Sequence, residues 1–381
     1  MCRLALKTAT DPFSPYSILE AMEAMQEGFD GSGLGLLLRG IDFSDYNYSK
    51  KRPILSGIAH TEAALHRLNA FMEEKGFELK YDHEFETDLS EIEAREDRYR
   101  YLTRVYSLPG AWDGFDQEEV EKHLMLTRLA LRRDGEDHGN DLTVFSFWPD
   151  VAMIKEVGWP LAVGKALGLD DDRIQARVVM AQGRQNTNWG INLYACHPFF
   201  IQGVATMTNG ENTAFIPIKD WLTGMNYPGY IGYQSDSEVF AHILHYCLKQ
   251  LKLPLEAYKH VITPLKTEEL ERHPQGDFLV GLRNATRRLI IDGPNCVIGS
   301  LPDETCLLVM DHKKLRPGTI GGKPGEWAMA SEMCGVEAMI PDRDRSLDFQ
   351  PMRENTVVVP PDRKEYKIWS QFDPFPFPLA A

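Results

Sequence analysis

The sequence predicts an α+β fold in which helices cover the faces of β-sheets. The first reason is that the second half of the chain is rich in short apolar or β-branched runs bounded by turn residues, which are typical of strands. These runs span residues 174–180, 203–207, 214–218, 295–298 and 305–310. The second reason is that helical spacing of apolar residues alternates with extended stretches in the first half. Short strands stacked between helices indicate layers of sheet and helix around a core.

The first predicted elements are a strand and a helix. Residues 2–7 read as a short strand. Residues 14–25 follow as a helix, because Ile18, Met22 and Met25 recur at the spacing of one helical face. The second residue of the sequence therefore stands at the first position of a strand.

Glycines dominate residues 30–35, which precede an apolar strand at 36–38. Their spacing matches neither the phosphate-binding loop G-x-x-x-x-G-K nor the dinucleotide fingerprint G-x-G-x-x-G, so we interpret them as a turn with a close backbone approach. From about residue 46 to 174, helical and extended stretches alternate, and their many charges are expected to form a solvated face. The elements predicted in this part span residues 61–74, 77–85, 117–133 and 142–147.

Composition limits the partners and the compartment. The chain has 41 Lys and Arg residues against 56 Asp and Glu, a net charge of −15, which argues against a nucleic-acid or anionic-membrane surface. No stretch approaches the roughly 20 apolar residues that span a bilayer, and the first residues hold no signal-peptide core. Six sparse cysteines without a C-x-x-C pair favour reduced thiols and do not suggest zinc. We therefore expect a cytoplasmic protein without a metal site.

Cys2 is the strongest candidate for a catalytic residue. Removal of Met1 would leave a thiol and an α-amino group on one residue, with ordinary pKa values of about 8.5 and about 7.7–8.0. At neutral pH part of that amine is neutral and can accept the thiol proton while the sulfur attacks a carbonyl. The alternative is that Cys2 is a small residue without a chemical role. The remaining parts of an acyl-transfer site must therefore be sought downstream.

Two clusters that follow predicted strands carry suitable polar groups. Arg184 follows the strand at 174–180, where its guanidinium could hold a carboxylate through two hydrogen bonds. The alternative for Arg184 is a surface salt bridge. Asn209 and Gly210 follow the strand at 203–207, and their N–H groups could stabilise an oxyanion. Asn-Gly is also a common turn dipeptide, so a hairpin corner is the competing interpretation.

A third cluster, Ser235 to Glu238, is predicted to open an amphipathic helix. Ser235 and Glu238 have the spacing of a capping box, and Asp236 in the first turn would complement the helix dipole. This interpretation explains the cluster without a function. It also leaves the Asp236 carboxylate fixed and outward-facing, which would suit the ammonium group of a substrate.

Together these residues describe a site for glutamine, which has an α-carboxylate, an α-amine and a reactive side-chain amide. They would supply a nucleophile, a carboxylate clamp, an oxyanion hole and an amine anchor, in the chain order Cys2, Arg184, Asn209-Gly210 and Asp236.

In these residues and their order, the chain resembles a class II glutamine amidotransferase, a member of the N-terminal nucleophile hydrolases. The resemblance covers roughly residues 2–45 and 175–340. Its motifs are Met1-Cys2, Asp30-Gly31-Ser32-Gly33, Arg184 with Thr187, Asn209-Gly210, Ser235-Asp236-Ser237-Glu238, the D-x-x-x-x-R-P segment Asp311 to Pro317, and Ala330-Ser331-Glu332. The chain departs from the family pattern at Arg3, Thr208 and Gln185-Asn186.

The resemblance implies a fold and a division of the chain. The implied fold is an α+β, four-layer αββα sandwich of N-terminal nucleophile hydrolases, with a long insertion at about 46–174. Residues 1–340 would form the amidotransferase domain, and residues 341–381 a C-terminal tail that packs on it or contacts a partner. The long gap between Cys2 and Arg184 further resembles the amidotransferase part of glutamate synthases.

The implied activity is hydrolysis of the glutamine side-chain amide through a thioester on Cys2. Asn209 and Gly210 would stabilise the oxyanion. The residues implied for binding the α-carboxylate and α-amine are Arg184, Asp236 and, to a lesser degree, Thr187. Ammonia would pass to a separate synthase subunit, glutamate-synthase-like and FMN-dependent, whereas this chain would carry no cofactor.

Two other hypotheses stay open. A stand-alone amidohydrolase could use the same site on a γ-glutamyl compound and release its product to water. A non-catalytic relative that serves only in interactions would be expected to lose Cys2, Arg184 or Asp236, yet all three are present. His197, which stands beside Pro198, is expected to be mainly structural.

Overall fold

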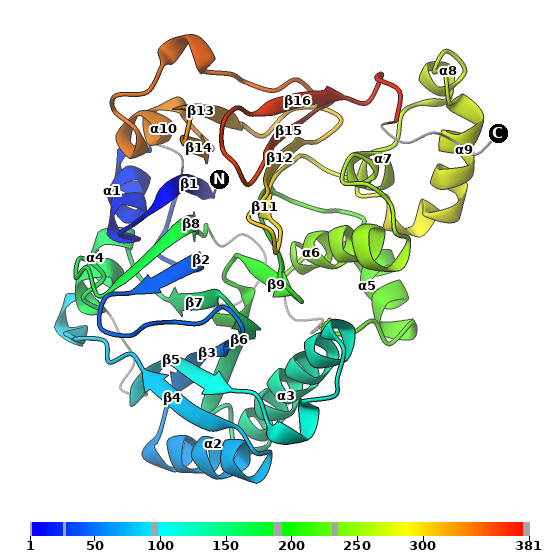
Figure 1. The fold of residues 1–381 in the computed structure, drawn as a ribbon. Coiled ribbons are helices and arrows are strands. Elements are labelled where there is room, and N and C mark those ends of the chain that lie inside the picture. The colour runs from blue at the N-terminus through cyan, green and yellow to red at the C-terminus, as the bar shows by residue number, and fades with distance from the viewer. Residues whose placement is uncertain (1, 26–27, 93–97, 186–192, 231–234, 376–381) are drawn as a thin grey trace.

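Three antiparallel sheets form the framework of the protein (Figure 1). The structure is a computed structural model that describes residues 2–25, 28–92, 98–185, 193–230 and 235–375. Sheet 1 has the strand order β13-β14-β1-β8-β2-β7. Its strands are β1 (Arg3–Phe13), β2 (Leu34–Phe43), β7 (Val151–Glu156), β8 (Ile174–Gly183), β13 (Thr319–Lys323) and β14 (Glu326–Ala330). The first strand of the sequence is thus an inner strand of this sheet.

Sheet 2 lies beside sheet 1 and has the order β16-β15-β12-β11-β10-β9. Its strands are β9 (Phe199–Ile201), β10 (Val204–Gly210), β11 (Asn295–Ser300), β12 (Cys306–Met310), β15 (Asn355–Val359) and β16 (Lys367–Ser370). The strands predicted at 203–207, 295–298 and 305–310 are therefore confirmed. Part of the expected tail beyond residue 340 forms β15 and the edge strand β16, which the sequence pattern did not predict. The division of the chain at residue 340 stays a prediction.

Sheet 3 is built from the part of the chain that was expected to be an insertion, and it has the order β4-β5-β3-β6. Its strands are β3 (Pro53–Ala59), β4 (Glu78–Asp82), β5 (Arg100–Ser107) and β6 (Leu142–Pro149). Helices α2 (Glu62–Glu74) and α3 (Gln117–Asp137) accompany it, as predicted. The start of α3 is fixed by a capping box, because Asp116 accepts from Glu119 N–H and the Glu119 carboxylate accepts from Asp116 N–H. Sheet 3 packs against β7 of sheet 1.

The remaining helices lie on the outer sides of sheets 1 and 2 (Figure 1). Those beside sheet 1 are α1 (Tyr16–Ala24), α4 (Pro160–Ala166) and α10 (Met333–Met339). Those beyond sheet 2 are α5 (Phe215–Gly224), α6 (Glu238–His245), α7 (Ala257–Ile262), α8 (Thr267–Leu270) and α9 (Gly276–Ala285). Short 3₁₀ turns occur at Leu89–Glu91, Gly110–Trp112, Leu193–Ala195, Arg287–Leu289 and Arg345–Leu347, and a π turn, Tyr246–Gln250, continues α6.

Helix α5 corrects one prediction. The strand expected at 214–218 is wrong, because this run opens a helix whose buried side chains Phe215, Ile218 and Leu222 recur at helical spacing. A short apolar run does not by itself distinguish a buried strand from a buried helix, and only the residues after 218 settle the choice.

Two hydrophobic cores lie on the two faces of sheet 2. Ala205 and Met207 of β10 belong to the core shared with sheet 1, whereas Val204 belongs to the core beneath the helices. This alternation follows from the two-residue repeat of a strand. It also sends the next residues of β10 to opposite sides, with Thr208 toward the helices and Asn209 toward sheet 1.

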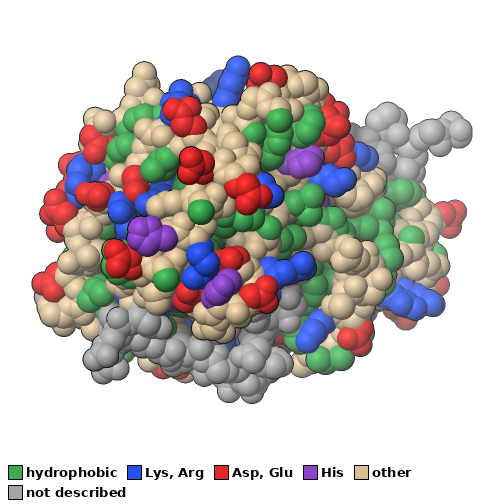
Figure 2. Space-filling model, turned by 90° about the horizontal axis from the view of Figure 1, so that it is seen from below, with side chains coloured by type: hydrophobic (Ala, Val, Ile, Leu, Met, Phe, Trp, Pro, Cys, Tyr) green, Lys and Arg blue, Asp and Glu red, His purple; other side chains and the backbone are tan. Residues whose placement is uncertain are grey.

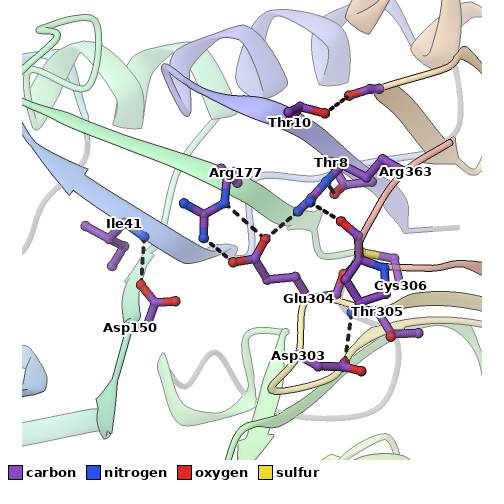
Figure 3. A network of polar contacts seen from close by, with 12 residues as sticks. Thr8, Thr10, Ile41, Asp150, Arg177, Asp303, Glu304, Thr305, Cys306 and Arg363 are labelled. Atoms are coloured by element: carbon purple, nitrogen blue, oxygen red, sulfur yellow. Dashed lines mark hydrogen bonds and ion pairs between the residues drawn. The ribbon is translucent and has the colours of Figure 1, made fainter. Parts of the chain in front are cut away.

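A buried carboxylate ties three segments together at one end of sheets 1 and 2 (Figure 3). Glu304, in the turn between β11 and β12, accepts hydrogen bonds from Arg177 of β8 and from Arg363, whose Nη2 lies 2.6 Å from Glu304 Oε2. Arg363 Nε also donates to Thr8 Oγ1 of β1, at 2.6 Å. Lys50 Nζ lies 3.4 Å from Glu304 Oε1. One network therefore joins sheet 1, the turn of sheet 2 and the segment after β15.

The charges of the inserted part do not all lie on a solvated face, so that expectation is wrong in part. Its buried charged residues include Arg104, Arg128, Lys155 and Glu156. Glu156 can be buried because Arg98 Nε and Tyr101 Oη both donate to its carboxylate at 2.7 Å. The sequence pattern does not display such pairing, because the partners are distant in the chain.

On the face seen from below, acidic and basic side chains are interspersed (Figure 2). That face shows no broad area of one sign, although the chain as a whole carries a net charge of −15. Within the described ranges, every helix is too short or too polar to cross a membrane.

Candidate active site

Cys2 lies directly before β1, which pairs with β14 on one side and β8 on the other. Ser331, just after β14, fixes this end of the strand. Its Oγ accepts the Leu4 N–H at 3.0 Å and donates to Cys2 O at 3.4 Å, while its own N–H donates to Leu4 O at 3.0 Å. The backbone of Cys2 is therefore held by a residue of the Ala330-Ser331-Glu332 motif.

Asn209 reaches Cys2 from sheet 2. The Cys2 N–H donates to Asn209 Oδ1 at 3.3 Å, which identifies Oδ1 as the acceptor and Nδ2 as the donor of this amide. Asn209 is buried, and its Nδ2 has no hydrogen-bond partner among the residues that the structure describes. A buried donor without an acceptor costs free energy. The Nδ2 group is therefore available to an acceptor that a ligand would bring.

Gly210 follows Asn209 as the last residue of β10, opposite Asn295. A Cβ atom at this position would lie 2.0 Å from Pro294 O, which is far inside van der Waals contact. Only glycine permits this approach of β10 to the segment before β11. The Asn-Gly pair thus lies at a strand end, next to Cys2, rather than at a two-residue hairpin turn.

The environment of the Cys2 thiol does not favour a free thiolate. Burial raises the pKa of the thiol. The Gln185 N–H, whose nitrogen lies 3.5 Å from Sγ, and the charge of Arg184 oppose this rise, whereas the charge of Asp236 adds to it. The thiol is therefore protonated at neutral pH and needs a base to become nucleophilic. The same interactions bring Arg184 and Asp236 within electrostatic reach of Cys2.

The glycine-rich turn between α1 and β2 cradles Arg184. The Arg184 N–H donates to Gly33 O at 2.7 Å, and Ser32 Oγ donates to Arg184 O at 3.1 Å. A Cβ atom on Gly33 would lie 2.4 Å from Cys196 Sγ, so glycine is required there. The interpretation of this segment as a turn with a close backbone approach is confirmed. Its consequence is a fixed backbone for Arg184, whose side chain is buried.

Asp236 lies in the turn before α6 rather than in its first turn. The helix begins at Glu238, and Ser235 Oγ accepts from the Ser237 N–H at 3.2 Å. The predicted capping box of Ser235 and Glu238 is therefore wrong, because Ser237 is the N-cap residue and the Ser235 hydroxyl bonds to Ser237 N–H instead of Glu238 N–H. The outward-facing carboxylate is also wrong. Asp236 is partly buried, and its Oδ2 accepts the Asn212 N–H at 2.6 Å.

Two further candidates have different outcomes. Thr187 lies outside the described residues. His197 is buried, and its Nδ1 accepts the Thr208 N–H at 3.0 Å. Burial, together with the charges of Arg184 and Lys155, holds the pKa of His197 well below its ordinary value, so the ring is neutral. A neutral ring with one nitrogen engaged by the backbone fits the mainly structural role that was expected.

Sequence reasoning missed several polar residues around the site. Gln182 of β8 links the two sheets, because its Nε2 donates to Thr208 O at 2.9 Å. Its only signal in the sequence is a glutamine at the end of the apolar run Val178 to Ala181. Asn212 contacts Asp236 and lies two residues after the Asn209-Gly210 motif, without a signal of its own. Ser237 belongs to the recognised motif Ser235 to Glu238, but its contact with Asp236 was not predicted.

The described residues offer little to a metal ion. No group of three or more His, Cys, Asp and Glu residues in the described part of the chain could hold one. A hollow of about 600 Å³ lies elsewhere, between α3 and the segment that includes Asn226 and Tyr230. Its lining includes Lys122 and Arg133 but neither cysteine nor serine. The case for chemistry therefore rests on the Cys2 end of the sheets.

Comparison with known proteins gives limited support. No model of a known protein family matches the chain. An uncharacterized protein of Archaeoglobus fulgidus is 26% identical over 225 residues, which are 58% of this chain and 57% of that protein. The chain thus aligns with little more than half the length of this relative.

Solved structures give likenesses of low score. The Bacillus subtilis glutamine phosphoribosylpyrophosphate amidotransferase, complexed with ADP and GMP, has a TM-score of 0.45 at 13% identity and covers 97% of this chain and 49% of its own. An allosteric regulatory enzyme of purine biosynthesis has a TM-score of 0.39 at 17% identity, and the match covers 58% of this chain and 40% of that enzyme's chain. A glutamine aminotransferase class-II domain protein from Silicibacter pomeroyi has a TM-score of 0.36 at 10% identity, and the match covers 98% of this chain and 100% of that protein's chain. At these TM-scores the likenesses carry no weight for function.

Proposed function

We propose that this chain is a class II glutamine amidotransferase subunit that releases ammonia from the side-chain amide of glutamine. The observation that carries the proposal is the contact of Cys2 N with Asn209 Oδ1, beside the Asn209 Nδ2 group that has no partner among the described residues. The thiol and the nitrogen of Cys2, beside sheet 1, thus lie next to an amide donor from sheet 2. That combination suits acyl transfer.

The first step would form a tetrahedral intermediate. After loss of Met1, Cys2 N would be an α-amine, oriented by Asn209 Oδ1. The amine takes the proton from Sγ as the sulfur attacks the side-chain carbonyl carbon of glutamine. Asn209 Nδ2 and the Gly210 N–H donate to the negative oxygen that develops. Because the buried thiol is protonated, it needs a base, and the α-amine of the same residue would supply one.

The second step would break the carbon–nitrogen bond. The proton on the α-amine passes to the leaving nitrogen, ammonia departs and a γ-glutamyl thioester remains on Cys2. Water then attacks the thioester carbonyl, its proton returns to the sulfur through the amine, and glutamate is released. The amine thus serves first as a base and then as an acid.

Two charged residues would recognise the ends of glutamine. Arg184 has a cradled backbone and would hold the α-carboxylate, with Thr187 as a lesser contact. Asp236 would bind the α-ammonium group. Their electrostatic effects on the Cys2 thiol, which are of opposite sign, support placing these two groups around one substrate.

The finer fold assignment belongs to the same proposal. Helices α1 and α10, sheet 1, sheet 2 and helix α6 follow one another across the molecule, which supports an αββα sandwich with residues 46–174 as an insertion (Figure 1). Free ammonia would otherwise be lost to water, so a separate synthase subunit would accept it. We infer a glutamate-synthase-like, FMN-dependent partner in the cytoplasm, with no cofactor in this chain.

The test is a glutaminase assay on the purified chain, with glutamate and ammonia measured together and the intact mass recorded. We expect equal amounts of both products and a mass that lacks Met1. Active material that retains Met1 would overturn the mechanism, because the amine would then be part of a peptide bond.

Comparison of glutamine with γ-glutamyl compounds addresses the alternative of a stand-alone amidohydrolase. A strong preference for a γ-glutamyl compound would favour that alternative. Purification of the cellular complex tests the partner, and a chain that reproducibly purifies alone would count against ammonia transfer.

A further inference from the structure

A chain of two buried hydroxyl groups leads from β10 to Asp236. Thr208 Oγ1 donates to Ser237 Oγ at 2.8 Å, and Ser237 Oγ donates to Asp236 Oδ1 at 3.0 Å. Thr208 is 1% exposed and Ser237 is 4% exposed. Both hydroxyls are therefore shielded from water, which could otherwise replace either bond.

The first hydroxyl of this chain starts from a fixed backbone. The Thr208 N–H donates to His197 Nδ1 at 3.0 Å, and Thr208 O accepts from Gln182 Nε2 at 2.9 Å. Since β10 alternates, Thr208 faces the helices while the neighbouring Asn209 faces Cys2. The same strand end thus orients the candidate oxyanion donor on one side and the hydroxyl chain on the other.

Asp236 is held on both of its oxygens. Oδ1 accepts from Ser237 Oγ, and Oδ2 accepts from the Asn212 N–H at 2.6 Å. Asn212 is itself fixed, because its Oδ1 accepts from the N–H groups of Ala214 and Asp292. Each carboxylate oxygen keeps lone-pair capacity for one more donor. A carboxylate in this state is oriented and partly desolvated, as an amine receptor requires.

We propose that Thr208 and Ser237 are positioning residues that orient Asp236 to receive the α-ammonium group of an amino-acid substrate. This inference rests on the proposed function for the identity of that substrate. Its geometry is independent of the nucleophile, because the two hydroxyls bond to each other and to Asp236, and neither donates to Cys2 within the described part of the chain. The chain would therefore govern recognition of the amine rather than the chemical step.

The kinetic test uses Ser237→Ala and Thr208→Val, with Thr208→Ser as a rescue. Loss of a hydrogen bond to a charged group predicts a rise of about tenfold or more in KM for glutamine in Ser237→Ala. Loss of the neutral bond behind it predicts a rise of about threefold in Thr208→Val. The kcat should stay within about twofold, because no transition-state contact is removed. Thr208→Ser should restore the wild-type KM.

Thr206→Val provides the matched control. Thr206 lies on the same face of β10, is 0% exposed, and its Oγ1 has no hydrogen-bond partner among the described residues. Its replacement removes a buried hydroxyl without touching the chain and should leave KM unchanged. An equal rise of KM in Thr206→Val and Thr208→Val would overturn the proposal, because general packing would then explain both.

A substrate without the amine and a measurement without turnover complete the design. For glutaramic acid, which lacks the α-amine of glutamine, Ser237→Ala should leave KM unchanged, and an equal rise for both compounds would refute amine recognition. Titration of the Asp236 carboxyl by ¹³C NMR should give a higher pKa in both chain variants than in Thr206→Val. An identical pKa in all variants would refute the coupling. The titration tests the coupling of the two hydroxyls to Asp236 even if the wild-type chain shows no glutaminase activity. Absence of glutaminase activity would count against the proposed function alone.

Discussion

One end of sheets 1 and 2 holds the Glu304 carboxylate network, whereas the other end holds the candidate active site. At the Glu304 end, one carboxylate is matched by Arg177, Arg363 and Lys50. At the Cys2 end, Asn209 Nδ2 is buried without a partner among the described residues. Gly183, at the Cys2 end of β8, follows Arg177 by six positions, a distance of about 20 Å.

This difference indicates a division of labour between the two ends. A network that satisfies its charges and joins distant segments contributes to stability. A buried donor without a partner costs stability, and at the Cys2 end this donor lies beside the candidate nucleophile. The comparison predicts that substitutions at the Glu304 end change unfolding, whereas substitutions at the Cys2 end change turnover.

The strongest challenge to this comparison is Cys2→Ala. We expect glutaminase activity to fall by about 10⁴-fold or more, because no other group could form the thioester. The thermal midpoint should be unchanged. Cys334→Ala is the matched control, since Cys334 is also a partly buried free thiol and should not affect turnover. Glutamate release measured over hours would reveal residual activity, and full activity in Cys2→Ala would exclude the mechanism.

Glu304→Gln should have the largest effect at the opposite end. It would leave the buried Arg363 and the partly buried Arg177 without their anion, so we expect the free energy of unfolding to fall by about 3 kcal/mol. Glu337→Gln removes the partner of Arg345 at an exposed pair and should cost at most about 1 kcal/mol. Urea unfolding measures both. Equal losses would contradict a special role for the Glu304 network, and activity per folded molecule should be unchanged in both variants.

Asn209→Ala tests the candidate oxyanion donor at the Cys2 end. Removal of one oxyanion donor predicts a loss of about 10²–10³-fold in kcat, with little change in KM. The side chain carries an unsatisfied group, so the variant should not be less stable than expected from lost packing alone. Steady-state kinetics and urea unfolding on the same sample would separate these effects. An unchanged kcat would remove Asn209 from the oxyanion site.

Acid unfolding should separate the two ends by pH. Burial opposes the charged form of Glu304, but hydrogen bonds from Arg177 and Arg363 outweigh it and lower its pKa from 4.5 to about 2. The stability that Glu304 contributes is therefore fully present above about pH 4.5 and is lost as pH falls toward 2, and it amounts to about 3 kcal/mol. Glu304→Gln should lack this part of the pH dependence, whereas Glu337→Gln should retain it. Unfolding curves at about pH 2, 3, 4 and 5 would test this, because they span roughly the window between the two pKa values.

Asp236→Asn should have the smallest effect. Loss of the charge weakens binding of an α-ammonium group, so KM for glutamine should rise by about tenfold while kcat changes little. The isosteric amide keeps the carboxyl's shape, which limits structural effects. Initial rates over a range of glutamine concentrations give both constants, and an unchanged KM would remove Asp236 from the site.

The sequence predicted the strand ends that carry the candidate site better than it predicted the local contacts there. β8 and β10 were recognisable because apolar runs ended at Arg184 and Asn209. The helix start at Glu238 was not, because the Ser235–Glu238 spacing fits a capping box that tertiary contacts override. The hydroxyl chain could not be predicted, since it joins residues 29 apart in the sequence.

The same contrast holds for the fold. Long segments with clear helical spacing, such as α2 and α3, were predicted within a few residues. The short run at 214–218 was assigned to the wrong type of element. Strand β15 was missed although its β-branched run Thr356 to Val359, bounded by Pro360, is typical of a strand. Strand β16 has only four residues and is defined by its pairing with β15.

The position of β1 has a consequence for how the protein folds during its synthesis. Cys2 is held by Ser331, and Leu4 bonds with the same residue across 327 positions of sequence. During translation, both edges of β1 can be paired only after β8 and then β14 have been synthesised. Such distant pairing slows folding and leaves a sheet edge exposed in the nascent chain. A ribosome-bound fragment that lacks residue 331 could not hold Cys2 through Ser331, so the candidate site can form only after nearly the whole chain has been synthesised.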